Sequence, residues 1–99
     1  MTRLIGHRPR LAWDGARAVV ATIEMGQHLQ LGRLLRDRWG FEFERHVEDS
    51  WMRMAVDPDR RLAEAGLWRA RLDDLLSQRP DLASAVASVV AEVTPYVGS

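Results

Sequence analysis

Residues 33–51 read RLLRDRWGFEFERHVEDSW, and this stretch decides how the chain folds. Gly40 directly follows Trp39 and is suited to end a helix in a left-handed conformation, which predicts a corner between two helices. Apolar residues then recur at helical spacing, which predicts a helix from about residue 41 to residue 56. The residues of this stripe are Phe43, Val47, Trp51 and Met54.

Two further helices are predicted after this corner. Asp57 and Pro58 are suited to the N-cap and first position of a helix over 58–78, and Pro80 is suited to begin the next one. Pro95 is expected to end that last helix. The first of the two carries an apolar stripe of Leu62, Ala65, Trp68, Leu72 and Leu75. The short connection between them predicts an antiparallel helical hairpin at the C-terminus.

Before the corner, residues 16–39 are dense in helix formers, and Asp14 is a suitable N-cap. The apolar residues of 16–39 fall on two sides of a helical wheel, which predicts burial in the domain on one side and at an oligomer contact on the other. Residues 1–13 lack periodicity and contain Pro9, so we expect a basic flexible arm followed by a single helical domain over 14–99.

An alternative prediction for residues 10–32 is a short β hairpin. Asp14-Gly15 is a hairpin turn signal, and residues 22–25 and 28–31 alternate between polar and apolar. Gly26 and Gly32 would each cost a helix about 1 kcal/mol. The predicted fold is therefore all-α, a small bundle of about four helices, with an α+β fold carrying a short hairpin in 10–32 as the alternative.

Composition limits the chemistry. The 99 residues include no cysteine, which excludes disulfides and thiolate sites, and the basic residues are all arginine, as is typical of a GC-rich bacterial genome. No apolar run approaches the roughly 18–20 residues of a membrane span, so we expect a cytoplasmic protein that does not enter a membrane. Residues 1–38 hold seven arginines and three acids (+4), whereas residues 39–99 hold seven arginines and eleven acids (−4).

The leading functional hypothesis is a small interaction or assembly module without catalytic activity or cofactor. It would associate with itself or bind another protein. Surplus tryptophan, opposite charge in the two halves and the two-sided helix over 16–39 all favour an interface. The predicted interface residues are Trp13, Met25, Leu29, Trp39 and Phe41.

A second hypothesis is a nucleic-acid-associated regulator, because clustered arginines can bind phosphate. The residues that would form this basic surface are Arg3, Arg8, Arg10, Arg33, Arg36 and Arg38. The helix over 81–92 has no Arg, Gln or Asn to read base edges, so contact with the backbone is the expected mode.

A third hypothesis is a metal-binding helical bundle. Two Glu-x-x-x-His pairs each place a carboxylate and an imidazole one helical turn apart, and carboxylate and imidazole together bind divalent metals. The predicted ligands are Glu24, His28, Glu42, His46 and Asp49. The alternative interpretation is that both histidines are exposed to solvent beside acidic residues and bind no metal.

Asp49-Ser50-Trp51 resembles the Asp-Ser-Leu motif of acyl carrier proteins, and the resemblance implies a phosphopantetheine arm on Ser50. It covers three residues. No glycine precedes Asp49, Trp51 stands in place of leucine, and Pro58 follows too soon for the helix of that family. Ser50 is therefore expected to be a polar residue on the outer face of a helix.

Overall fold

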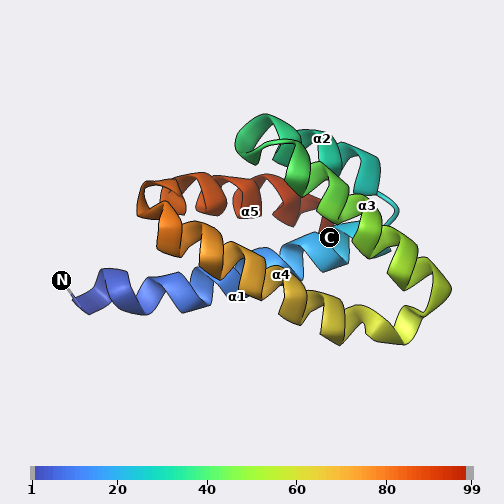
Figure 1. The fold of residues 1–99 in the computed structure, drawn as a ribbon, viewed down its shortest axis with the longest axis horizontal. Coiled ribbons are helices and arrows are strands. Elements are labelled where there is room, and N and C mark those ends of the chain that lie inside the picture. Colours follow the sequence, from blue (N-terminus) through green and yellow to red (C-terminus); the bar gives the residue numbers. More distant parts are fainter. Residues whose placement is uncertain (1, 98–99) are drawn as a thin grey trace.

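The computed structural model describes the backbone of residues 2–97 and the side chains of residues 9–93. These residues form five α-helices and two short 3-10 turns (Figure 1), and no strand occurs among them. The predicted all-α bundle is confirmed, and the β hairpin considered for 10–32 is wrong. The elements are α1 (Thr2–Glu24), α2 (His28–Trp39), α3 (Phe41–Val56), η1 (Pro58–Arg60), α4 (Arg61–Gln78), η2 (Pro80–Leu82) and α5 (Ala83–Val97).

Helix α1 is the centre of the bundle, because α4 and α5 both pack mainly on it. Its buried face is formed by small and β-branched residues, namely Ala12, Ala16, Val19, Val20 and Ile23. Gly15 lies where α1 packs closely against α4. A Cβ at this position would lie 2.7 Å from Cδ1 of Leu72 on α4, so the Leu72 side chain would have to shift to make room for a larger residue.

The beginning of α1 differs from the prediction. Residues 2–13, which were expected to form an arm, are the first turns of α1, and the helix runs through Asp14 without a break. Asp14 therefore does not cap a helix; its carboxylate lies 3.9 Å from the guanidinium of Arg10, one turn earlier. The apolar face that packs on α4 and α5 already includes Ala12, and this burial extends the helix beyond the local capping signal.

The single helix predicted over 16–39 is also wrong, because the chain turns at Gly26. This glycine has φ +79°, and the N–H of Gln27 donates to the carbonyl of Thr22 at 3.1 Å, as in a Schellman C-cap. The apolar residues assigned to two faces of one helix are therefore divided between α1 and α2. Ile23 on α1 and Leu31 and Leu35 on α2 belong to the same core.

The corner at Trp39-Gly40 is confirmed, and α2 packs along α3 as a helical hairpin. Gly40 has φ +110°, and its N–H donates to the carbonyl of Arg36 at 2.9 Å. Val47 and Met54 face the core as predicted. Trp51 does not, since 41% of it is exposed. The ring of Trp39 packs edge-on against Phe43, with 5.1 Å between the centroids.

The second half of the chain follows the prediction closely. Asp57 accepts a hydrogen bond of 3.1 Å from the N–H of Asp59, and the predicted 58–78 helix begins with η1 before it continues as α4. Leu62 is 81% exposed and does not belong to the core stripe. The chain reverses at Pro80 into α5. That helix runs on through Pro95 to Val97, so its predicted end was wrong.

No helix in the part of the chain that the structure describes has both the length and the apolar character needed to cross a membrane.

Candidate functional site

A groove lined mainly by apolar residues lies between the end of α1 and the second half of α3. Its volume is about 300 Å³, and it is lined by Ile23, Glu24, Trp51, Met54, Ala55 and Pro58. Ile23 and Met54 also belong to the hydrophobic core, so the floor of the groove is continuous with the interior of the protein. We call these six residues the α1–α3 groove.

Several large apolar residues are exposed at positions close in sequence to the residues of this groove. Three of them directly adjoin a lining residue in the sequence: Met25, Met52 and Val56. The other two, Leu29 and Leu62, adjoin His28 and Arg61, which contact lining residues. Val56 and Leu62 are more than 80% exposed. Grouping of exposed large apolar side chains around a hollow is typical of a surface that another molecule covers.

Two contacts fix the walls of the groove. The imidazole of His28, at the start of α2, stacks on the ring of Trp51 with 4.3 Å between centroids and 13° between planes. The guanidinium of Arg61 lies 3.4 Å from the carboxylate of Glu24, which lines the groove, and ties the end of α1 to the start of α4. The groove is therefore a preformed surface held by three helices.

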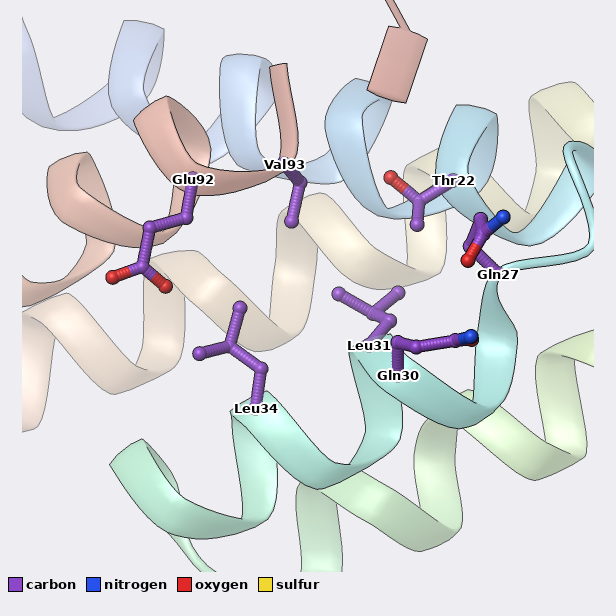
Figure 2. Close-up of a pocket in the computed structure, with 7 residues that line it drawn as sticks. All are labelled: Thr22, Gln27, Gln30, Leu31, Leu34, Glu92 and Val93. Carbon is purple, nitrogen blue, oxygen red and sulfur yellow. The ribbon is translucent and has the colours of Figure 1, made fainter. Parts of the chain in front are cut away.

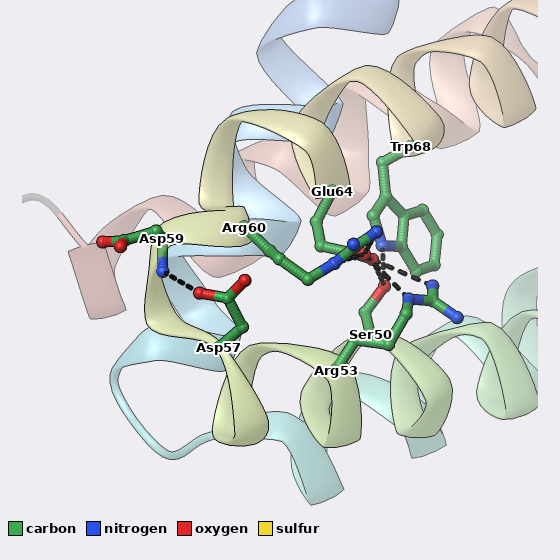
Figure 3. Close-up of polar contacts among 7 residues, drawn as sticks. All are labelled: Ser50, Arg53, Asp57, Asp59, Arg60, Glu64 and Trp68. Carbon is green, nitrogen blue, oxygen red and sulfur yellow. Dashed lines mark hydrogen bonds and ion pairs between the residues drawn. The ribbon is translucent and has the colours of Figure 1, made fainter.

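A buried polar network sets the position of α3 relative to α4 (Figure 3). The Ser50 hydroxyl donates to Oε1 of Glu64 at 2.7 Å and accepts the indole N–H of Trp68 at 2.8 Å. Arg53 binds both oxygens of the same carboxylate at 2.8 and 2.9 Å. Arg60 adds a weaker contact of 3.3 Å. Ser50, Glu64 and Trp68 are all fully buried.

The charge state of Glu64 follows from this network. Burial by itself would raise the pKa of Glu64, but the hydrogen bonds from Arg53 and Ser50 outweigh it and lower the pKa below its usual value of 4.5. Glu64 is therefore ionised at neutral pH and serves as an acceptor for two helices. The network is a structural support for the α3–α4 corner, because none of its oxygens is open to a substrate.

His46 lies beside this network on α3, where its ring meets Trp68 edge-on at 6.2 Å. Burial lowers the pKa of His46 below 6.5, and the positive charge of Arg71 adds to this; Glu42 and Asp49 oppose it. His46 is thus neutral at physiological pH.

A second pocket, of about 320 Å³, separates α2 from α5 (Figure 2). It is lined by Thr22, Gln27, Gln30, Leu31, Leu34, Glu92 and Val93. The Thr22 hydroxyl donates to the carbonyl of Ala18 at 2.6 Å, and Glu92 accepts a hydrogen bond of 2.6 Å from Arg38. Because these two polar groups already have partners within the protein, they are not free to bind a ligand in this pocket.

Four of the five predicted interface residues are exposed, and the five do not form one surface. Met25 and Leu29 flank the α1–α2 corner beside the groove, whereas Phe41 lies at the other end of α2 and is 76% exposed. Trp13 lies on α1 between the guanidinium groups of Arg17 and Arg69, at 5.7 and 5.4 Å from its ring. Trp39 is half-buried and packs on the core.

The predicted basic surface is largely neutralised. Arg36 lies 3.6 Å from Glu44, Arg38 pairs with Glu92, and Arg10 pairs with Asp14. Arg33 is exposed on α2. The side chains of Arg3 and Arg8 lie outside the described residues.

The predicted metal site is not assembled. Among the described residues, no group of three or more His, Asp or Glu side chains could hold a metal ion. Glu24 pairs with Arg61 and His28 stacks on Trp51, while His46 packs against Phe43 and Trp68. The shared Glu-x-x-x-His spacing therefore reflects two separate packing arrangements.

Ser50 is not on an outer face, and the prediction that it would be was wrong. It is completely buried and bonded to Glu64 and Trp68, so its hydroxyl cannot carry a phosphopantetheine arm in this structure. The residues of the network and most of those lining the groove were missed as a site. One signal was present: a glutamate stands between the apolar positions of the helix over 58–78, and a carboxylate on a buried face requires a partner.

Comparisons of this chain with protein-family models, with curated proteins and with solved structures found no match.

Proposed function

We propose that this protein is a non-catalytic interaction module that binds another protein chain through the α1–α3 groove. The observation that carries the proposal is the exposed apolar surface. Trp51 in the groove and the five exposed apolar residues close to it in sequence are six of the nine large hydrophobic residues exposed in the described part. Leaving such residues in water is costly, since full burial of each stabilises a structure by about 1.5–3 kcal/mol.

The geometry suits an apolar anchor from a partner. Trp51 forms one wall with an aromatic face already held by His28, and aromatic side chains in preformed hollows are frequent centres of binding energy. The polar network behind α3 keeps this wall in place, so little ordering would be needed when a partner binds. A helix that inserts one or two apolar side chains is the kind of partner that this groove fits.

The test is affinity capture from the cells that produce the protein, with three forms of the chain. Ala55 is exposed in the groove, and Ala55→Arg would place a charged side chain across it. Ala87→Arg introduces the same residue at an exposed position on α5 and is the matched control. We expect a protein, or a further copy of this chain, to be retained by the wild type and by Ala87→Arg and lost by Ala55→Arg. Equal capture by all three forms, or no capture, contradicts the proposal.

A further inference from the structure

The two ends of this elongated molecule differ in charge. The described part measures 43 × 27 × 26 Å, and Figure 1 places the start of α1 at one end and the α3–α4 corner, beside the groove, at the other. At the groove end, Asp57 and Asp59, on either side of the lining residue Pro58, are exposed. The arginines there are engaged: Arg61 binds Glu24, and Arg53 and Arg60 bind Glu64. The groove is therefore apolar with an acidic rim.

The opposite end has the complementary composition. Residues 2–10 read TRLIGHRPR, with arginine at positions 3, 8 and 10, of which Arg10 pairs with Asp14, no acid, and an adjacent apolar pair, Leu4-Ile5. Figure 1 shows the first turns of α1 extending beyond the turn between α4 and α5. A short helical segment with apolar and basic residues is the partner chemistry that an acid-rimmed apolar groove favours.

A chain cannot place this segment in its own groove. Glu24, which lines the groove, is the last residue of the helix that begins at Thr2. A continuous helix of this length holds its two ends about 33 Å apart. The segment can reach a groove only on another molecule.

We infer that the α1–α3 groove binds residues 2–10 of a second copy of this chain. This inference rests on the proposed function of the groove and names its occupant. The contact is heterologous, since one copy contributes its first turns and the other its groove, and the pair keeps one unused surface of each kind. Association is therefore head-to-tail, grows with concentration and weakens as salt screens the contact between arginines and acids.

Complementation between two variants tests this directly. The segment variant Arg3→Glu/Arg8→Glu keeps the groove, and the groove variant Ala55→Arg keeps the segment. Each alone should associate more weakly than the wild type, by on the order of tenfold or more. Mixed together, they supply one intact segment and one intact groove. Light scattering should then show a capped 1:1 dimer, with twice the 11.3 kDa mass of one chain, while Ala87→Arg should associate like the wild type.

Other outcomes overturn the inference and separate it from the proposed function. If Ala55→Arg abolishes association but the segment variant associates like the wild type, the groove is an interface and residues 2–10 are not its occupant. If neither variant changes association, the copies associate through other surfaces and the inference fails, while the capture experiment still decides the proposed function. A wild-type chain that stays monomeric at every concentration overturns the inference alone, and the capture experiment then decides the proposed function. Circular dichroism of each variant confirms that a loss of association is not a loss of folding.

Discussion

The indole N–H of Trp68 on α4 donates a 2.8 Å hydrogen bond to the hydroxyl oxygen of Ser50 on α3, and both side chains are fully buried. Ser50 in turn donates to Glu64, so one small side chain satisfies two buried polar groups at once. This relationship fixes the angle at which α3 leaves the bundle. The wall of the α1–α3 groove formed by α3 is therefore held against α4 by buried hydrogen bonds.

Ser50→Ala should lower the free energy of unfolding by about 1–3 kcal/mol, because Trp68 loses its acceptor and Glu64 loses a donor in a buried site. Urea denaturation gives the measurement. Ser88→Ala, at an exposed position on α5, is the control and should change stability by less than about 0.5 kcal/mol. Equal effects of the two substitutions would contradict the role given to Ser50.

Glu64→Ala should be more damaging, with a loss of about 2–4 kcal/mol, because it leaves Ser50 without its acceptor and both Arg53 and Arg60 without their anion. Arg53 and Arg60 are themselves only partly buried and can regain water, which keeps the loss below that of a fully enclosed ion pair. The same denaturation experiment measures it. A smaller loss than that of Ser50→Ala would show that the carboxylate is not the centre of the network.

Stability should fall in two steps as the solution is acidified. The pKa of His46 is lowered below 6.5 in the folded protein, so the unfolded chain takes up this proton first and stability falls as the pH drops below 6.5. The lowered pKa of Glu64 adds a second loss as the pH falls below 4.5. Denaturation midpoints across this range show both steps. In His46→Gln the first step should shrink, and an unchanged first step would exclude His46 as its source.

Gly40→Ala should destabilise the protein by about 1–3 kcal/mol, because its φ of +110° is strained for any residue with a Cβ. A Cβ at Gly40 would have no other atom within 4 Å, so the loss of stability would come from the backbone conformation alone. Gly66→Ala, in the interior of α4 and also with open space around it, should instead stabilise by about 0.5–1 kcal/mol. Thermal denaturation of the two variants gives the comparison, and changes of the same sign would contradict this account.

Ala55→Arg should leave stability within about 0.5 kcal/mol of the wild type, because Ala55 is exposed on a helix and arginine is a good helix former. The melting temperature measures this. A large loss would mean that the groove is part of the core rather than a surface, and the association experiments would then need another variant.

The elements with strong local signals were predictable from sequence. Gly40 and Pro58 mark their corners because their backbone preferences act over one or two residues, and α3 and α4 carried clear apolar stripes. The limits of α1 were not predictable in the same way. Gly26 ends the helix within a run that reads as one helix, and burial against α4 and α5 extends its start beyond Asp14.

The candidate site was harder to predict, for a physical reason. Whether Trp51 faces the core or the solvent depends on where α2 begins, since His28 covers one face of its ring and leaves the other side open. Ser50 and Glu64 lie 14 residues apart on separate helices, and only the angle between α3 and α4 brings them together. Spacing along the chain carries no information on that angle.

The indole N–H signals of Trp13, Trp39, Trp51 and Trp68, followed by NMR during a dilution series and on addition of any captured partner, test the central claim most directly. We predict that the Trp51 signal shifts as the groove is filled, while the signal of Trp68, buried and bonded to Ser50, stays in place. A Trp51 signal that does not move while other signals respond to association would contradict the claim that the groove is the binding surface.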